Sequence, residues 1–376
     1  MKHIIVVSPI PSHPQFQGNS ARIFRLTQMY QLAGYKVHFV YFGMEGLSSQ
    51  QRFDMQDCWD FFYFVQPQGP AALPSFDGYF DIDDWYDHRV SNTVEKICSR
   101  YKIDICLTNY VWFSKVLDVV PQSVQKIIDT HDVFGDRHLI AKKAGLEPVW
   151  FYTTIELEAF GLSRANLIFA IQDEEKDYFE NITNVPTEVM GYVVPKHSLL
   201  ETKPMDQQKI KIGYIGSGNP FNVQSIIELQ KQILIKPEVL NQFEFLVAGT
   251  ICKNIADQNK IFSLRGKVHE LEDFYCEIDI AINPMVGGTG LKIKSLEALS
   301  FGKPLVGTLD AMVGIETESK YHLCDTVEEL ISLLLNFNKI DFDNLKQESA
   351  EVFVKYNQRH IGRFNALFNL EKLVNT

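Results

Sequence analysis

Short apolar runs alternate with longer helical patterns along most of this 376-residue chain, and this alternation restricts its fold more than any other feature. Apolar runs of about four to eight residues bounded by turn residues are typical of buried strands, and their alternation with helices is typical of a parallel sheet. Two such series occur, one starting at residues 4–7 and the other at 211–215. The sequence therefore predicts an α/β protein with two Rossmann-like domains.

The length of the chain also favours two domains, because 376 residues exceed the size of one typical core. We place an N-terminal domain at residues 1–200, a C-terminal domain at 201–350 and a C-terminal helix at 351–376. The polar segment 196–208 is the expected linker. The terminal helix either caps its own domain or crosses back onto the N-terminal domain.

Composition and charge exclude several classes of protein. A net charge of −11 disfavours nucleic acid as the main partner, because phosphate binding requires a basic surface. No apolar run reaches the roughly 18 residues of a membrane-spanning helix, and the apolar start of the chain is better explained as a first strand than as a signal peptide. Six cysteines without a CxxC pair suit a reducing cytoplasm. We expect a cytoplasmic protein; a peripheral contact with the inner membrane surface stays open.

The segment NPMVGGTGLKIKSLEALSFGKPLVGT, residues 283–308, carries the clearest functional signal. Its glycines precede a helical pattern, so backbone N–H groups and the helix dipole can bind an anion. Spacing of three and four residues places Gly290, Lys294 and Glu297 on one helix face. A carboxylate is a natural acceptor for a ribose diol, and Lys292 or Lys294 could neutralise a diphosphate. The segment predicts a nucleotide-sugar site.

The same segment resembles the donor-binding signature of glycosyltransferases with the GT-B fold. It is most similar to the large retaining family (group 1, family 4-like) that includes sucrose-synthase-like and mannosyltransferase-like enzymes. The pattern there is a glycine-rich loop, a helix with Glu-Ala-Leu and then Gly-Lys-Pro, which stand here at 287–290, 297–299 and 302–304. The resemblance implies two Rossmann-like domains facing across a cleft, a nucleotide-diphosphate sugar as donor, and a glycan, lipid-linked or small-molecule acceptor. It implies no further cofactor and no metal.

The resemblance assigns a set of residues to the donor, with Glu297 on the ribose hydroxyls. The set consists of Glu297, Lys292, Lys294, Gly288, Thr289, Gly290, Leu291, Gly216 and Ser217. Two features depart from the family. Retaining members usually carry a glutamate eight residues before Glu297, where this chain has Thr289, and loop 216–222 lacks the arginine and lysine of many relatives. The retaining outcome therefore stays open.

The turn after the first predicted strand leads through Gly18 and Asn19 into a helix that carries Arg22. It resembles the acceptor-side loop of the same glycosyltransferases, where a proline-rich turn and a glycine precede a helix with a basic residue. The resemblance assigns Gly18, Asn19 and Arg22 to the acceptor side. The alternative is a loop and helix that only connect two strands.

A second polar turn, Asp129-Thr130-His131-Asp132, follows the strand predicted at 126–128. Titratable side chains after a buried strand are costly unless they are exposed or paired. The family often has a His-Asp here, which implies that His131 contacts the sugar or acceptor and that Asp132 is a base or hydroxyl ligand. The alternative is a solvated loop with a surface pair between Asp136 and Arg137.

Competing signals point to other functions. Residues 81–84, Asp-Ile-Asp-Asp, resemble the metal-binding mark of the other glycosyltransferase fold, GT-A, but so short a motif is weak. An NAD enzyme is disfavoured because the loop after the first strand lacks GxGxxG. We predict a glycosyltransferase of bacterial-type surface polysaccharide or glycoconjugate synthesis. A catalytically degenerate GT-B subunit that binds a glycan or a partner, or a sugar-nucleotide 2-epimerase-like enzyme, remains the alternative.

Overall fold

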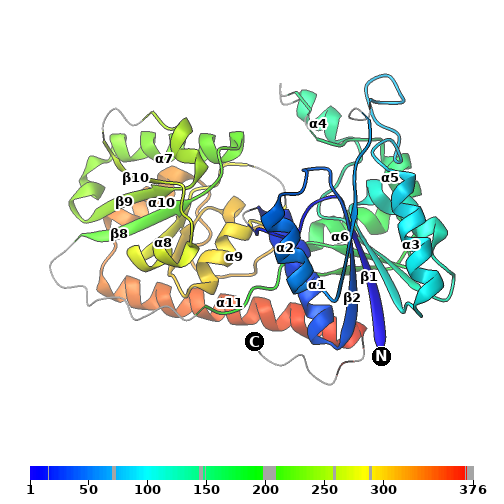
Figure 1. Ribbon diagram of the computed structural model, residues 1–376. Coiled ribbons are helices and arrows are strands. Elements are labelled where there is room, and N and C mark those ends of the chain that lie inside the picture. Colours follow the sequence, from blue (N-terminus) through cyan, green and yellow to red (C-terminus); the bar gives the residue numbers. More distant parts are fainter. Residues whose placement is uncertain are drawn as a thin grey trace. The chain divides into compact units, whose positions relative to one another are not determined.

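The computed structural model describes all residues except 16, 70–72, 144–146, 149, 198–208, 257–259, 288–289, 369 and 371–376. The chain divides into two units. Unit 1 contains Met1–Val193 and the described residues from His360 on, and unit 2 contains Val194–Arg359. Each unit is a parallel sheet with helices packed beside it (Figure 1). The predicted α/β class with two Rossmann-like domains is confirmed.

Unit 1 contains a seven-stranded sheet in the order β3-β2-β1-β4-β5-β6-β7. Its strands are β1 Lys2–Ser8, β2 Tyr35–Phe42, β3 Phe61–Val65, β4 Ile105–Asn109, β5 Gln125–Asp129, β6 Leu167–Ala170 and β7 Thr187–Val189. Its helices are α1 Gly18–Leu32, α2 Ser49–Cys58, α3 His88–Arg100, η1 Val111–Val119, α4 Arg137–Lys143, α5 Ile155–Leu162 and α6 Asp173–Ile182. The order reverses between β1 and β4, and ligands of open α/β sheets bind outside the carboxyl ends of strands at such a switch point.

Unit 2 contains a five-stranded sheet in the order β10-β9-β8-β11-β12, with its switch point between β8 and β11. Its strands are β8 Ile210–Ile215, β9 Phe243–Ala248, β10 Phe262–Gly266, β11 Ile280–Asn283 and β12 Leu305–Gly307. Its helices are α7 Pro220–Ile235, η2 Pro237–Asn241, η3 Thr250–Asn254, α8 Leu271–Glu277, α9 Ile293–Ser300, η4 Leu309–Met312 and α10 Val327–Leu335. Both glycine-containing loops singled out in this half of the sequence, at 216–218 and 287–290, follow the two strands of the switch point.

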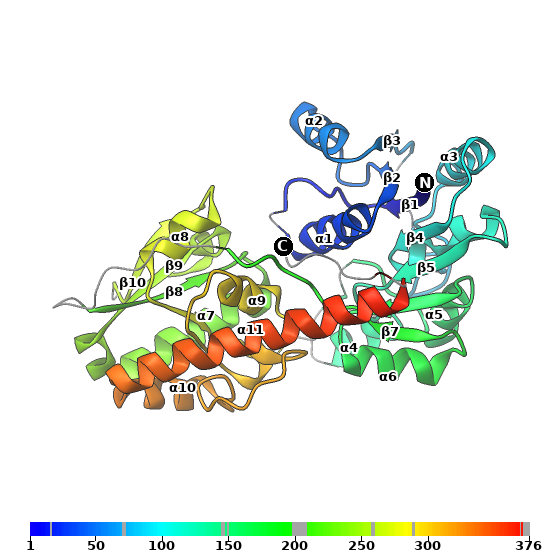
Figure 2. The same cartoon turned by 90° about the horizontal axis from the view of Figure 1, so that it is seen from below.

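One further helix, α11 Lys339–Leu367, is continuous over 29 residues (Figure 2). It begins at Lys339 and not near residue 351, where the sequence pattern places the terminal helix. Its residues up to Arg359 belong to unit 2, and its residues from His360 on belong to unit 1, where Phe364 packs against Tyr30 with ring centroids 5.0 Å apart. Most of the predicted linker, residues 198–208, lies outside the described residues. Among the described helices, none is long and apolar enough to cross a bilayer.

A buried histidine connects α11 to β12 within unit 2. His322 lies with Nε2 3.3 Å from the Oγ of Ser349 on α11 and with Nδ1 2.7 Å from the Oγ1 of Thr317. The same Ser349 hydroxyl accepts a hydrogen bond from the backbone N–H of Leu305 at 3.1 Å. Burial lowers the pKa of His322 from 6.5 to about 4, so the folded protein holds the neutral ring.

This histidine should make unit 2 sensitive to acid. Between pH 6.5 and pH 4 His322 is protonated in the unfolded chain but neutral in the folded chain. The free energy of unfolding therefore decreases as the pH falls from 6.5 towards 4. At about 1.4 kcal/mol per pKa unit, the loss is about 3 kcal/mol. Urea unfolding at pH 7.5 and pH 4.5 measures it, with His322→Gln as the comparison because a neutral amide does not titrate. An equal loss of stability in both proteins would contradict this role.

Candidate functional site

Two residues of the glycine loop of unit 2 adopt a backbone conformation that favours glycine. Gly287 and Gly290 have φ angles of 71° and 78°, in the left-handed region that favours glycine. Helix α9 does not begin at the glycines, because Lys292 is still non-helical with φ −89° and ψ 89°. The predicted helix face that included Gly290 is therefore wrong at its start. Lys294 and Glu297 do lie on one face of α9, as their spacing predicts.

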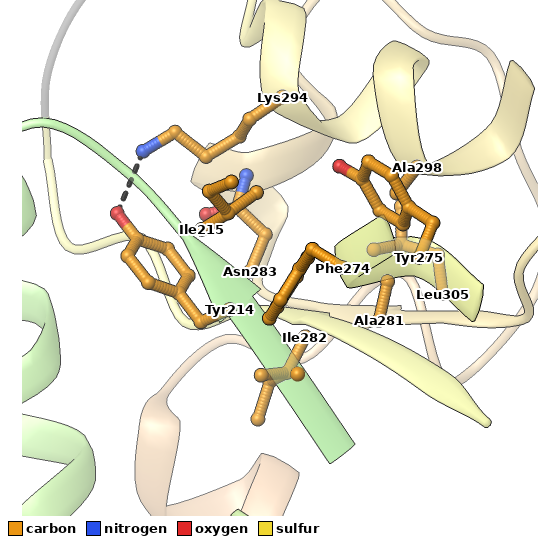
Figure 3. Close-up of a pocket in the computed structure, with 11 residues that line it drawn as sticks. Tyr214, Ile215, Phe274, Tyr275, Ala281, Ile282, Asn283, Lys294, Ala298 and Leu305 are labelled. Carbon is orange, nitrogen blue, oxygen red and sulfur yellow. Dashed lines mark hydrogen bonds between the residues drawn. The ribbon is translucent and has the colours of Figure 1, made fainter. Parts of the chain in front are cut away.

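Lys294 reaches across the switch point from α9. Its Nζ donates a hydrogen bond to the hydroxyl of Tyr214 on β8 at 2.8 Å (Figure 3). The same Nζ donates another hydrogen bond to the Oδ1 of Asn222 on α7. Burial lowers the pKa of Lys294 to about 7, and the nearby charge of Lys292 acts in the same direction. Both hydrogen-bond partners are neutral, so an anionic ligand would stabilise the charged form of this lysine.

Glu297 stands one turn further along α9 and is half-buried. Its Oε1 accepts a hydrogen bond from the hydroxyl of Tyr275 on α8 at 2.9 Å. The Tyr275 ring stacks on Phe301, with centroids 4.4 Å apart, which fixes the donor hydroxyl. Burial raises the pKa of Glu297 to about 7. The two candidate donor contacts of α9 thus titrate in the same pH range.

The backbone of the glycine loop is held at its start by side chains from other elements. Gly287 N–H donates to Asp310 at 2.6 Å, and Val286 N–H donates to the hydroxyl of Ser225 at 3.0 Å. The hydroxyl of Thr308 donates to the carbonyl of Met285 at 2.6 Å. Sequence reasoning missed Ser225, Thr308 and Asp310, since no local pattern joins them to the loop.

The structure describes some of the other loop residues of the predicted donor set but not all of them. Lys292 donates from Nζ to the carbonyl of Gly290 at 2.6 Å, and Leu291 is half-buried. Gly288 and Thr289 lie outside the described residues.

Gly216 and Ser217 follow β8, and Gly216 packs closely against Gly249, the residue after β9. A Cβ atom on Gly249 would lie 2.1 Å from the carbonyl oxygen of Gly216, so this approach requires glycine at position 249. The Nδ2 of Asn222 donates to the carbonyl of Ser217 at 3.0 Å, while the Oδ1 of the same residue accepts from Lys294. Asn222 therefore links the loop after β8 to the lysine of α9. The amide at position 222 is one more residue that sequence reasoning missed.

Unit 1 contains a buried ion pair at the carboxyl end of β5. Asp129 is the last residue of β5 and is completely buried, and Arg22 of α1 is 2% exposed. The guanidinium donates from Nη2 to Oδ1 at 2.5 Å and from Nε to Oδ2 at 2.9 Å. Arg22, which the sequence analysis assigned to the acceptor side, thus forms a buried ion pair with Asp129.

His131 lies beside this ion pair. Its Nε2 is 3.2 Å from the Oδ2 of Asp129 and 2.9 Å from the Oδ1 of Asn109, the last residue of β4. Its ring stacks on Tyr110, with centroids 4.3 Å apart. Burial lowers the pKa of His131 to about 4. Sequence reasoning missed Asn109, although a polar residue that ends an apolar strand was a usable signal.

The start of α1 contacts Tyr110, the residue on which the His131 ring stacks. Helix α1 begins at Gly18, and the side chain of Asn19 is hydrogen-bonded to the hydroxyl of Tyr110. Tyr110 therefore lies between Asn19 and His131. The structure brings the predicted acceptor-side residues and the predicted sugar-contacting histidine to one edge of the unit 1 sheet.

Asp132 is partly exposed and paired. Its Oδ2 accepts from Arg137 Nη1 at 2.6 Å, so the predicted surface pair between Asp136 and Arg137 is wrong. Asp136 takes a φ of 55° in the turn before α4. The arginine therefore pairs with the carboxylate five positions away rather than with its neighbour.

Two buried carboxyl groups near Asp132 were not singled out from the sequence. Glu158 on α5 accepts from the backbone N–H of Phe134 and Gly135 and from the Tyr178 hydroxyl. Burial raises the pKa of Glu158 to about 7 and that of Glu175 on α6 to about 8, and the charge of Asp132 raises both further.

The aspartates at 81–84 make hydrogen bonds and ion pairs within unit 1. Asp83 accepts from both terminal nitrogens of Arg164, at 2.6 and 2.8 Å. Asp84 accepts from the backbone N–H of Asp81 at 2.8 Å. In the described part of the chain, no three His, Cys, Asp or Glu side chains are grouped to hold a metal ion.

Comparison with known proteins identifies what this chain is similar to. Residues 209–335 match the family described as "Glycosyl transferases group 1". No curated protein sequence matches the chain.

Solved structures match it over nearly its whole length. Staphylococcus aureus TarM is 13% identical, with 98% of this chain and 100% of that chain covered and a TM-score of 0.67. HepE of Anabaena is 14% identical, with 98% and 100% covered and a TM-score of 0.65. Sucrose-phosphate synthase of Thermosynechococcus elongatus is 13% identical, with 98% and 100% covered and a TM-score of 0.61. The GT-B fold is confirmed, as is the resemblance to group 1 glycosyltransferases.

Proposed function

We propose that this protein is a glycosyltransferase that moves a sugar from a nucleotide-diphosphate donor to a glycan, lipid-linked or small-molecule acceptor. The match of residues 209–335 to group 1 glycosyltransferases supports the class of reaction. The observation that carries the donor is the group formed by Lys294, Tyr214 and Asn222 beside Glu297, at the switch point of unit 2. Among the residues that the structure describes, no carboxylate forms an ion pair with this buried lysine. Such a lysine, next to a half-buried glutamate, suits a diphosphate joined to a ribose.

In this proposal unit 2 binds the nucleotide. Lys294 and Lys292 stabilise the diphosphate as it leaves, together with backbone N–H groups of the glycine loop, and Glu297 accepts from the ribose hydroxyls. The bond between the sugar and the diphosphate breaks as the bond to an acceptor hydroxyl forms. Because two lysines neutralise the phosphates, we expect no requirement for a divalent cation.

Unit 1 binds the sugar or the acceptor. His131 contacts the sugar, Asp132 contacts a hydroxyl or accepts its proton, and Gly18 and Asn19 lie on the acceptor side. Titles of similar structures support ligands of this kind: HepE was solved with UDP and glucose, and TarM with UDP and alpha-GlcNAc-glycerol. We place the reaction in the cytoplasm, in the synthesis of a surface polysaccharide or glycoconjugate, with a peripheral contact to the inner membrane surface.

A catalytically degenerate binding subunit is the second candidate, favoured by Thr289 in place of the sugar-side glutamate. The two functions differ in one product. A transferase releases free nucleoside diphosphate only when acceptor is present, whereas a binding subunit releases none.

Calorimetric titration of UDP, GDP and ADP, with and without EDTA, tests the donor site. We expect one nucleotide to bind with an affinity that EDTA changes by less than about twofold, because lysines and not a metal neutralise its charge. Binding that disappears with EDTA and returns with manganese would establish a metal-dependent site. Absence of binding for all three nucleotides would contradict the donor assignment.

A further inference from the structure

Three aromatic rings of unit 2 form a stack beside the carboxylate of Glu297. The ring of Phe301 lies between those of Tyr275 and His197, with centroids 4.4 Å and 4.1 Å away and planes tilted by 17° and 10°. Two rings this close cannot share one face of Phe301, so they lie on its opposite faces. Offset stacking at such distances stabilises aromatic pairs. We call these three side chains the aromatic stack.

Helix α9 places Phe301 and Glu297 on the same face. Phe301 follows Glu297 by four positions, which is about one helical turn. Its backbone N–H donates to the carbonyl of Glu297 at 3.2 Å, and Gly302, with a φ of 66°, ends the helix directly after it. The Phe301 side chain is buried. The end of the helix therefore fixes this ring one turn away from the carboxylate.

Tyr275 connects the aromatic stack to the carboxylate. Its hydroxyl donates to the Oε1 of Glu297 at 2.9 Å. Burial and the charge of Glu297 raise the pKa of Tyr275 well above its usual value, so the hydroxyl keeps its hydrogen and is the donor. Burial raises the pKa of Glu297 to about 7, whereas the hydrogen bond from Tyr275 and the charge of Lys294 lower it. The hydroxyl thus favours the charged carboxylate and fixes the position of its Oε1.

His197 lies at the other end of the aromatic stack, in residues 194–197, with which the chain enters unit 2. Two contacts hold this entry segment. The backbone of Val194 accepts from the Nδ2 of Asn357 on α11 at 2.7 Å and donates to its Oδ1 at 3.3 Å. His197 N–H donates to the carbonyl of Ser300 at 2.9 Å. The His197 side chain is exposed, so we expect its removal to affect folding little.

We propose that His197, Phe301 and Tyr275 are positioning residues that hold the Glu297 carboxylate in place for the ribose hydroxyls of the nucleotide. The proposal rests on the glycosyltransferase function proposed above, in which Glu297 accepts from the ribose. Tyr275 uses one acceptor position of the carboxylate and leaves others for a diol. Without this contact the side chain must be ordered when the ligand binds, which lowers affinity. The entry segment of unit 2 thereby acts on donor binding.

Two substitutions at position 197 test the stack. The ligand is whichever of UDP, GDP and ADP the natural protein binds, and calorimetry measures its affinity. His197→Ala should lower the affinity about fivefold, the effect of one aromatic contact, while His197→Phe keeps a ring on Phe301 and should stay within about twofold. Ile340→Ala on α11 is the matched control, because it shortens a side chain of the same unit that is 71% exposed. It should change the affinity by no more than about twofold.

A substitution of Tyr275 tests the route to the carboxylate. Tyr275→Phe keeps the ring, removes the hydroxyl and should lower the affinity about tenfold. In this background His197→Ala should cause no further loss, because the stack acts through the hydroxyl. Both effects should disappear with the dideoxy form of the same nucleotide, which has no ribose hydroxyls for Glu297. A purely structural role would weaken the binding of both nucleotide forms alike.

The outcomes separate this inference from the function on which it rests. A natural protein that binds the nucleotide no better than His197→Ala and Tyr275→Phe do would overturn the positioning role and leave the donor site intact. Losses that are the same for the ribose and dideoxy forms would overturn the route through Glu297. Absence of binding for all three nucleotides would overturn both the function and the positioning role. If Tyr275→Phe does not fold, the comparison of the two nucleotide forms in the His197 variants decides alone.

Discussion

Arg22→Met should lower the free energy of unfolding of unit 1 by about 3–5 kcal/mol, the typical cost of removing one partner of a buried ion pair. The substitution leaves the completely buried carboxylate of Asp129 without the guanidinium that donates to both of its oxygens. All four tryptophans, at positions 59, 85, 112 and 150, belong to unit 1. Tryptophan fluorescence during urea unfolding therefore reports on this unit specifically, and the midpoint should fall by about 1–2 M.

Two further variants give this prediction its controls. Lys36→Met breaks a partly exposed ion pair with Asp60 (2.6 Å) in the same unit and should cost no more than about 1 kcal/mol. The double variant Arg22→Met with Asp129→Leu replaces both buried charges by apolar groups and should recover most of the lost stability. Equal midpoints for Arg22→Met and Lys36→Met would show that the buried ion pair contributes no more to the free energy of unfolding than the partly exposed one.

The order of strands and helices was predictable because it depends on local patterns. The apolar runs at β1, β2, β8, β9 and β12 identify strands without tertiary information. The boundaries that failed are those that local patterns do not encode. Nothing in the residues themselves indicates that Lys292 is extended and delays α9. Residues 339–350 are mostly polar, so the first third of α11 lacks the apolar spacing that marks its later turns.

The candidate site shows the same division. The sequence correctly places Lys294 and Glu297 on one face of α9, because residues three positions apart in a helix lie on the same face. Their partners Tyr214 and Tyr275 come from β8 and α8, and no sequence pattern specifies those contacts. The failed Asp136–Arg137 pair has the same cause, since adjacency in the chain is a poor guide to pairing.

Unit 1 gives the strongest example, because Arg22 and Asp129 are 107 residues apart. Their contact follows from the order of the sheet: β1 lies next to β4, and β4 lies next to β5. A polar residue at the end of each adjacent strand then faces the same edge. With that order known, Asn109 and Asp129 become candidates together with His131.

Glu297→Gln should lower donor affinity about tenfold to a hundredfold, since hydrogen bonds to charged groups contribute about 1.5–3 kcal/mol. Glutamine preserves the shape of the side chain and can still accept from Tyr275, which holds the carboxylate at 2.9 Å. The matched control is Glu328→Gln on α10, whose side chain is 65% exposed. A surface change of this kind should alter affinity by no more than about 0.5 kcal/mol. Calorimetry with the nucleotide sugar measures both.

The pH dependence of that difference decides whether the charge of Glu297 is responsible. Burial raises the pKa of Glu297 to about 7, so its carboxyl gains a proton as the pH falls through 7, and a protonated carboxyl resembles the amide of glutamine. The natural protein and Glu297→Gln should therefore differ fully at pH 8 and converge towards pH 5. Titration of the ligand affects both proteins equally and cancels in the comparison, whereas the charge of Glu297 raises the pKa of Lys294, so this lysine loses its proton at a lower pH in Glu297→Gln. A gap that is unchanged from pH 8 to pH 5 would mean that shape, and not charge, makes Glu297 important. Equal affinities at pH 8 in a folded variant would remove this residue from the donor site.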